Sequence, residues 1–308
     1  MKHDDRPIGI FDSGIGGLTV AHALRTLLPS ESIVYFGDTA HLPYGDKSAE
    51  SIKHYSMEIA TMLYQHDCKA ILIACNTASA YSFQSIRKAF GNKLPVMNVI
   101  DPVAAYVGET YTNRKVGVIG TRGTISSRIY PKRIRKYNKS TKVTQLATPL
   151  LAPMIEEGFF NNNISQTIIN SYLSKKSFQG IEALILGCTH YPLIKKEVKK
   201  YYKGATEIID SADVVARHVG QTLANKELLR SAGKPKDRFY VSDFTASFEK
   251  STRIFFHDRI HLEEMRIWDW SFEPTWILHV VIGDPHYLPF EQLRVHIFDL
   301  FCGHSSVQ

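Results

Sequence analysis

The sequence predicts an α/β protein made of two pseudo-symmetric α/β domains, whose mostly parallel sheets face each other across a central cleft. Short segments rich in Val, Ile and Leu alternate with helical patterns over the first two-thirds of the chain. Three strand-end segments also occur twice in the same order, which indicates two homologous halves. The composition, with 308 residues, 44% hydrophobic and 22% charged, is that of a globular protein long enough for two domains.

The predicted strands are short, apolar and bounded by Gly, Pro, Asn or Asp, as buried parallel strands tend to be. They are Ile8–Phe11, Ile33–Phe36, Ala70–Ala74, Val96–Ile100, Val116–Ile119, Val143–Leu146, Ala183–Leu186 and Glu207–Ile209. Helical patterns predict Leu18–Leu28, Ala49–His66, Ala78–Phe90 and Ile164–Ser174. Ligands of such folds bind at the carboxyl ends of the strands, so the residues that follow each strand are candidates for a site.

The internal repeat places two cysteines at equivalent strand ends. The matched segments are Ile8–Ser13 with Val116–Thr121, Ala70–Thr77 with Ala183–His190, and Val99–Pro102 with Ile208–Ser211. If the halves face each other, Cys75 and Cys188 approach a substrate from opposite sides. Such a pair of thiols can remove a proton from one face of a carbon and return one to the other face.

Both cysteines have a local context that favours chemistry. Cys75 follows an apolar strand and opens a helix, where the dipole and free amides stabilise a thiolate. Cys188 is predicted to repeat this geometry, with His190 two residues further on as a partner for the thiol. Taken singly, either cysteine could equally be a buried core thiol. Cys68 and Cys302 lack the context and are interpreted as structural.

Three further segments leave alternatives open. Gly9–Gly17 is a strand end and a Gly-rich turn that enters a helix, a place where main-chain amides can bind an anion. Asp12 in this turn either has a catalytic task or simply caps the helix. Pro43–Gly45 reads by itself as an ordinary turn. Glu156 is either a solvated acid or part of a site, and the residues alone do not decide between the two.

Composition argues against several other classes of protein. The 4 cysteines and 13 histidines show no metal-ligand spacing, so we expect neither a metal site nor a disulfide framework. No apolar run approaches the ~18–20 residues of a membrane span, and no secretory leader is recognisable, so we expect a cytoplasmic protein with reduced thiols. The net charge of +7 has no accompanying nucleic-acid-binding motif and is interpreted as solvated helix faces.

The strand-end segments together resemble the glutamate racemases of the cofactor-independent Asp/Glu racemase superfamily. The resemblance runs from about Pro7 to about Trp270. It is carried by Gly9–Gly17, Pro43–Gly45, Cys75–Ser79, Gly187–Pro192 and Ile209–Ala212. It implies a first domain over 1–97 plus 210–270 and a second over 98–209, with 271–308 as a carboxyl-terminal extension. The extension is expected to pack on the core or to mediate self-association, and a homodimer stays open.

The resemblance also implies roles for individual residues. Cys75 and Cys188 would be the two acid/base groups, Asp12 would assist Cys75, His190 would assist Cys188, and Glu156 would be an assisting acid. The positions around the substrate would be Asp12, Ser13, Pro43, Tyr44, Gly45, Asn76, Thr77, Thr121, Thr124 and Thr189. The implied reaction interconverts L- and D-glutamate without a cofactor and supplies D-glutamate for peptidoglycan precursors.

The sequence also leaves three alternatives to glutamate racemisation. The same chemistry on aspartate is the nearest alternative, because sequence does not measure the length of a pocket. A basic nucleic-acid-binding or protein-binding module that retains the racemase fold is a second alternative. A phosphate-binding transferase is a third, disfavoured because the Gly-rich turn has neither a Walker A nor a Gly-x-Gly-x-x-Gly pattern.

Overall fold

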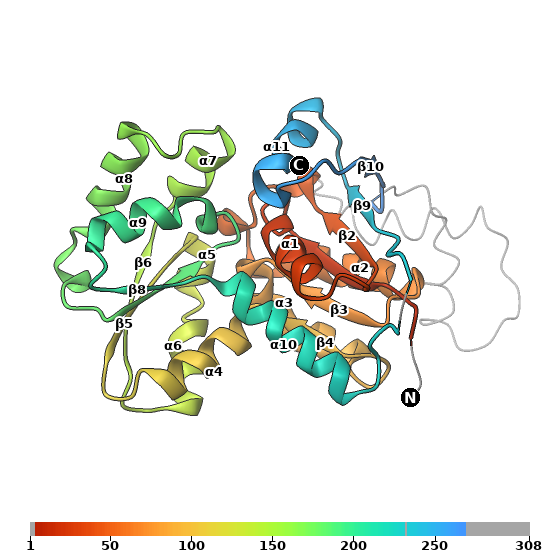
Figure 1. Ribbon diagram of the computed structural model, residues 1–308, viewed down its shortest axis with the longest axis horizontal. Helices are drawn as coiled ribbons and strands as arrows, with labels where there is room; N and C mark the ends of the chain where they lie inside the picture. Colours follow the sequence, from red (N-terminus) through yellow and green to blue (C-terminus); the bar gives the residue numbers. More distant parts are fainter. Residues whose placement is uncertain (1–3, 232, 269–308) are drawn as a thin grey trace, which may run out of the picture. The chain divides into compact units, whose positions relative to one another are not determined.

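Two all-parallel sheets organise the protein in a computed structural model that describes residues 4–231 and 233–268 (Figure 1). The predicted α/β class is therefore confirmed. The described residues up to Ile267 form one compact unit. The predicted extension over 271–308 lies outside the described residues. The domain limits drawn at 97 and 210 stay a prediction.

The first sheet has six strands in the order β10-β9-β2-β1-β3-β4. Its strands are β1 (Ile8–Asp12), β2 (Ile33–Gly37), β3 (Ala70–Ile73), β4 (Val96–Asn98), β9 (Arg238–Val241) and β10 (Leu262–Glu264). The helices that pack on this sheet or on each other beside it are α1 (Leu18–Leu27), α2 (Ala49–Gln65), α3 (Asn76–Phe90), α10 (Ser211–Asn225) and α11 (Ala246–Phe256). Two 3-10 turns, η1 (Thr39–His41) and η2 (Tyr44–Asp46), follow β2.

The second sheet has four strands in the order β6-β5-β7-β8. They are β5 (Lys115–Gly120), β6 (Lys142–Ala147), β7 (Ala183–Gly187) and β8 (Glu207–Ile209). The accompanying helices are α4 (Ile100–Thr110), α5 (Arg122–Ser126), α6 (Ile129–Tyr137), α7 (Leu151–Glu156), α8 (Asn163–Leu173) and α9 (Lys195–Tyr202), with 3-10 turns η3 (Lys176–Phe178) and η4 (Tyr191–Ile194). After β8 the chain returns through α10, which packs against both α4 and α1 (Figure 1).

The repeat seen in the sequence reappears as a repeat of strand order and register. Strands β2-β1-β3-β4 and β6-β5-β7-β8 run through the chain in the same relative order. Ile8 pairs with Ala70, and Val116 pairs with Ala183, which are the residues that the sequence match makes equivalent. Every residue of β1, β3 and β7 is buried, as expected for parallel strands covered by helices on both faces.

The predicted strand Val96–Ile100 is wrong at its carboxyl end, and two strands were not predicted from the sequence. Strand β4 ends at Asn98, and Ile100, which was predicted as strand, is the first residue of α4. The side chain of Asn98 accepts hydrogen bonds from the amides of Ile100 and Asp101 at 2.8 and 2.9 Å, so it starts the helix there. Strand β9 was missed because its apolar run is only three residues long, and β10 because two of its three residues are Glu. Both become strands by extending the sheet beyond β2.

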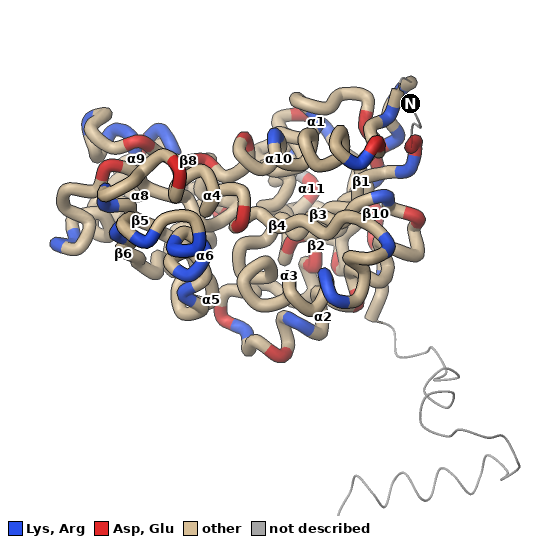
Figure 2. The backbone as a smooth tube through the Cα atoms, turned by 90° about the horizontal axis from the view of Figure 1, so that it is seen from below, with Lys and Arg blue, Asp and Glu red and all other residues tan. Residues whose placement is uncertain are grey.

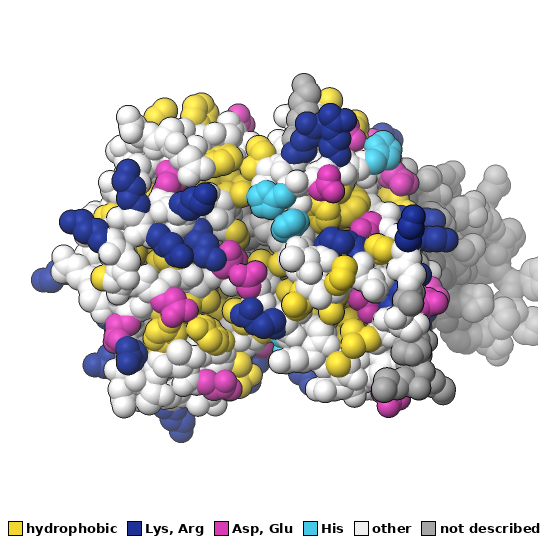
Figure 3. Space-filling model, viewed as in Figure 1, with side chains coloured by type: hydrophobic (Ala, Val, Ile, Leu, Met, Phe, Trp, Pro, Cys, Tyr) yellow, Lys and Arg dark blue, Asp and Glu magenta, His cyan; other side chains and the backbone are white. Residues whose placement is uncertain are grey.

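The basic residues of the second half lie on solvated helix faces. Figure 2 shows Lys and Arg along α6 and α9, and the space-filling view shows basic side chains over the face that carries α9 (Figure 3). Lys132, Lys136, Lys196 and Lys200 are exposed. Among the described helices, none combines the length and apolar character that crossing a membrane requires.

Lys69 and Glu31 form a buried ion pair just before the first residues of β3 and β2, and breaking this pair should lower the stability of the protein. Lys69 Nζ lies 2.6 Å from Glu31 Oε2 and donates to the carbonyl of Asp4 at 2.7 Å. Lys69→Met should lower the free energy of unfolding by about 3–5 kcal/mol, because the Glu31 carboxylate stays buried without its cation. Urea denaturation measures this. The exposed Lys53→Met on α2 is the control and should change it by no more than about 0.5 kcal/mol. Equal effects of the two variants would contradict the interpretation.

Candidate active site

Cys75 stands between the end of β3 and the start of α3 and is held as a thiol. Its sulfur accepts from the amide of Ala78 at 3.4 Å and donates to the hydroxyl of Ser13 at 3.6 Å. Burial, and then the negative charge of Asp12, raise the pKa of the Cys75 thiol to about 12. The stabilisation by a helix start that the sequence predicted is present in the Ala78 amide, but burial outweighs it.

Cys188 follows β7 but does not open an α-helix, so the predicted repeat of the Cys75 geometry is wrong in this respect. The chain turns into the 3-10 helix η4, and α9 begins only at Lys195. The neighbour of the Cys188 sulfur is instead His190 Nδ1, at 3.6 Å. Negative charge on Cys188 is among the causes that raise the pKa of Cys75, so the two thiols lie close enough to influence each other.

His190 connects Cys188 to Glu156. Its Nε2 lies 2.8 Å from Glu156 Oε1, at the end of α7, while Nδ1 faces the Cys188 sulfur. Burial by itself lowers the pKa of His190, but hydrogen bonds to Cys188 and Glu156 outweigh burial and raise the pKa well above its usual value. A protonated imidazole with two N–H donors fits these two acceptors. Glu156, which the sequence left undecided, therefore lies in direct contact with the site.

Asp12 ends β1 and is completely buried. Its Oδ2 accepts from the amide of Gly14 at 3.1 Å, and the hydroxyl of Thr189 donates to Oδ1 at 3.5 Å. Burial raises the pKa of Asp12, and the charge of His190 and nearby amides act against that rise. Helix α1 begins at Leu18, with Gly17 at its cap position and no side-chain cap, so Asp12 does not serve as the helix cap.

The Gly-rich turn after β1 lets the ends of the two sheets touch. A Cβ on Gly16 would lie 2.4 Å from His190 Cε1 and 2.7 Å from Thr189 Oγ1. A Cβ on Gly17 would lie 2.5 Å from Asp12 Cβ. Only glycine permits these approaches, because real Cβ atoms do not occur at such distances. The turn therefore places Asp12 against the segment that carries Cys188 and His190.

A cluster of threonines joins the two sheets on the other side of the thiols. The hydroxyl of Thr77 lies 2.8 Å from that of Thr121 and 3.1 Å from that of Thr124. Thr121 also caps α5 by accepting from the amide of Thr124. A Cβ on Gly45 would lie 2.8 Å from Thr121 Cβ, so η2 belongs to the same cluster. These positions, predicted separately from the sequence, therefore meet in the structure.

Two other predicted positions have partners of their own. Pro43 follows a cis peptide bond and precedes η2. The Tyr44 hydroxyl donates to Asp38 Oδ2 at 2.6 Å, so this hydroxyl is already satisfied by the protein. The carboxylate of Asp38, in turn, accepts from the Ser242 hydroxyl at 2.8 Å.

The sequence analysis missed three residues that border the site. Asp38 directly follows β2, and its place at a strand end was a usable signal. The hydroxyl of Tyr35 donates to the carbonyl of Gly14 at 2.6 Å and fixes the Gly-rich turn. The hydroxyl of Tyr130 donates to Asn76 Oδ1 at 2.7 Å. Tyr35 comes from an apolar strand and Tyr130 from a basic helical stretch, and no local pattern singled out either of them.

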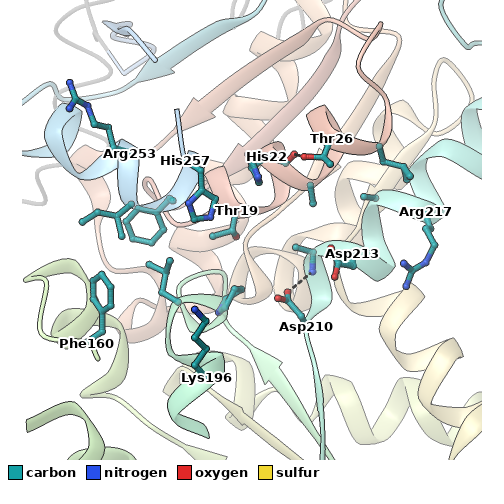
Figure 4. A pocket seen from close by; sticks show the side chains of 18 of the residues that line it. Thr19, His22, Thr26, Phe160, Lys196, Asp210, Asp213, Arg217, Arg253 and His257 are labelled. Atoms are coloured by element: carbon teal, nitrogen blue, oxygen red, sulfur yellow. Dashed lines mark hydrogen bonds between the residues drawn. The ribbon is translucent and has the colours of Figure 1, made fainter. Parts of the chain in front are cut away.

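A separate hollow of about 770 Å³ lies beside the site (Figure 4). It is lined by residues of α1, α10 and α11, together with Lys196 and Phe160. Thr19 belongs to this lining and donates to the carbonyl of Thr189 at 3.0 Å. Phe255 also lines the hollow and packs edge-on against His190, with ring centroids 5.3 Å apart. Two residues that line the hollow, Thr19 and Phe255, therefore also contact Thr189 and His190 of the candidate active site.

The fold and the site define a class of α/β proteins in which each of two parallel sheets brings one thiol to a shared buried site. Among proteins of this class, a family model described as Asp/Glu/Hydantoin racemase matches residues 18–219. The chain belongs to this family.

Particular relatives are glutamate racemases. That of Neisseria meningitidis serogroup A is 43% identical over 79% of this chain and 90% of the relative. The crystal structure of glutamate racemase from Francisella tularensis, in complex with D-glutamate, matches with a TM-score of 0.81 and 37% identity, covering 87% of this chain and 100% of that one. Escherichia coli glutamate racemase in complex with L-glutamate and an activator matches with a TM-score of 0.64 and 27% identity, covering 79% and 91%.

The protonated state of His190 should appear in the pH dependence of stability. A histidine whose pKa is raised in the folded protein contributes stability that is complete below its unfolded pKa of about 6.5 and is lost as the pH rises through the folded pKa. The stability advantage of the wild type over His190→Gln should therefore shrink as the pH rises above about 6.5, by at most about 1.4 kcal/mol per pH unit.

Urea denaturation across the pH range measures this, and His22→Gln is the matched control. The pKa of His22 is lowered, by burial first and then by the charge of His257. The advantage of the wild type over His22→Gln should consequently shrink as the pH falls. The same slope for both histidines would contradict a charged His190.

Proposed function

We propose that the protein is a glutamate racemase, which interconverts L- and D-glutamate by proton transfer at the α-carbon and supplies D-glutamate for peptidoglycan precursors. The observation that carries the proposal is the pair of buried thiols, Cys75 and Cys188, one at the end of each sheet. The relatives support the substrate, since solved glutamate racemases of similar fold hold D-glutamate in one case and L-glutamate in another.

The two thiols have different neighbours, and a two-base reaction needs one thiol and one thiolate. Burial keeps Cys75 protonated, while the neighbour of the Cys188 sulfur is the imidazole of His190, whose pKa is raised. The sulfur that carries the charge takes the α-proton from one face, and the thiol donates its proton to the other face. The product is the opposite enantiomer, and the protonation states of the two sulfurs have exchanged, so the reverse reaction uses the same groups in exchanged roles.

The remaining residues make the proton transfer feasible. The α-hydrogen of an amino acid is much less acidic than a thiol, so the transition state needs a dry site and preorganised donors. Asp12 lies buried next to Cys75, and Glu156 holds the imidazole that faces Cys188. Ser13, Asn76, Thr77, Thr121, Thr124 and Thr189 supply hydroxyl and amide groups around the thiols, and Pro43, Tyr44 and Gly45 form the adjoining wall. This proton chemistry asks for no cofactor.

The protein is further proposed to act in the cytoplasm, where its thiols stay reduced. A homodimer is part of the same proposal and is tested by the mass of the protein in solution. If the chain were instead a basic binding module with a racemase fold, it would bind nucleic acid in a salt-sensitive manner and leave both enantiomers unchanged.

Replacing either thiol should abolish racemisation. Cys75→Ser and Cys188→Ser should each lower kcat by at least about 10³-fold, because the serine hydroxyl is far too weak an acid to exchange roles with a thiol. Circular dichroism with either pure enantiomer as substrate measures the rate. Cys68→Ser is the control and should retain most of the activity. Cys68 is buried against Gly9 of β1 and precedes β3, so it lies at the amino end of a strand and not at a carboxyl end. Full activity in either of the first two variants would refute the two-thiol mechanism.

The substrate is tested by incubating each enantiomer of glutamate in deuterated buffer without added cofactor. Loss of optical rotation should accompany entry of deuterium at the α-carbon. The same assay with aspartate separates the two acidic substrates, and we expect kcat/KM for glutamate to be the larger. Inertness towards both enantiomers of glutamate would refute the proposal.

A further inference from the structure

Tyr130 is a fully buried side chain of α6 that contacts the segments of both thiols. Its ring lies beside Gly187, where an added Cβ would be 3.4 Å from Tyr130 Cε2, and Gly187 directly precedes Cys188. Its hydroxyl donates to Asn76 Oδ1 at 2.7 Å, and Asn76 directly follows Cys75. One rigid side chain thus links the neighbours of the two sulfurs.

The hydrogen bond from Tyr130 joins the two sheets and has a fixed direction. Helix α6 lies between β5 and β6 of the second sheet in the chain and packs against α4. Asn76, by contrast, is the first residue of α3, which follows β3 of the first sheet. Burial, and then negative charge on Cys188, raise the pKa of Tyr130, so its hydroxyl remains a donor at neutral pH. A donor selects the oxygen of the Asn76 amide, which fixes the amide orientation.

The nitrogen end of the same amide lacks a partner within the part of the chain that the structure describes. Asn76 Nδ2 is buried and has no hydrogen-bond acceptor among the described residues. An unpaired buried donor is costly, so the structure retains this orientation of Asn76 against a penalty. Without the Tyr130 hydroxyl, nothing that we observe would hold the amide in this orientation.

We propose that Tyr130 is a positioning residue, which sets the separation of the Cys75 and Cys188 segments so that a carbon deprotonated by one sulfur is protonated by the other. This inference rests on the proposed racemase function. Its physical reason is that proton transfer from two opposite faces tolerates little displacement of either sulfur. If the segments shift apart, the deprotonated carbon regains a proton from the sulfur that removed it.

The variant Tyr130→Phe keeps the ring and removes only the hydroxyl. We expect kcat to fall about tenfold for both enantiomers, the size of effect that follows from one lost hydrogen bond to a buried acceptor. In deuterated buffer, the sulfur that holds the removed proton can exchange it for deuterium before it returns it to the same face. The starting enantiomer that is recovered at early times should therefore contain more α-deuterium per racemisation event than with the wild type. That ratio, measured by chiral chromatography and mass spectrometry, does not change when a variant is merely less stable.

Tyr111→Phe is the matched control. Tyr111 is also a buried tyrosine whose hydroxyl donates to a side chain, that of Glu207, and it lies at the end of α4 rather than at the thiols. This variant should keep kcat within about twofold and the deuterium ratio of the wild type. If both variants give the same kcat and the same ratio, the inference is wrong.

Asn76→Ala provides an independent check through a double-mutant cycle. If Tyr130 acts through Asn76, the double variant should lose about as much kcat as Asn76→Ala alone. Independent, multiplying losses would overturn the inference. An inactive wild type would instead refute the proposed function itself, so the two failures are distinguishable.

Discussion

The meeting of two sets of strand ends is the constraint on which the rest of this structure depends. Two sheets with the same strand order bring β1 and β3 from one side and β5 and β7 from the other. Their ends approach so closely that glycine is required at position 16, against His190, and at position 45, against Thr121. Because parallel strands present all their carboxyl ends at one edge, a duplicated sheet can enclose a small site from two sides. Burial of Asp12, Cys75 and Cys188 is the direct result.

The two halves are equivalent in backbone and different in electrostatics. Cys75 has an amide and a hydroxyl as neighbours, and burial keeps it protonated. Cys188 has a charged imidazole, which Glu156 holds from the outside. Two equal thiols in a dry site would resist carrying a single negative charge, because burial disfavours the charged form of each. The histidine stands on one side only, so the symmetric fold gives the two thiols different electrostatic surroundings.

Much of this could be predicted from the sequence, because buried parallel strands and the residues at their ends leave a strong local pattern. Eight strands, the repeat and the candidate thiols were all visible in this way. The helix start at Ile100 was not, since it depends on a side chain two residues earlier that competes with the strand. The 3-10 turn after Cys188 also escaped prediction, because a 3-10 turn and an α-helix have similar beginnings, whereas the His190 neighbour was predicted. Tyr35 and Tyr130 act through single hydroxyl groups, and only tertiary structure shows where those hydroxyls point.

The position of Tyr130 follows from the same constraint. A site closed by two sheets has no single rigid element that holds both sulfurs, so their separation depends on contacts that cross between the halves. The cluster of Thr77, Thr121 and Thr124 provides one such contact, but none of its members is adjacent in sequence to either cysteine. Tyr130 contacts the immediate neighbours of both thiols, because its ring lies beside Gly187 and its hydroxyl donates to Asn76. The symmetry of this duplicated fold is therefore broken next to the thiols, where one side chain of the second half reaches the strand-end segment of the first.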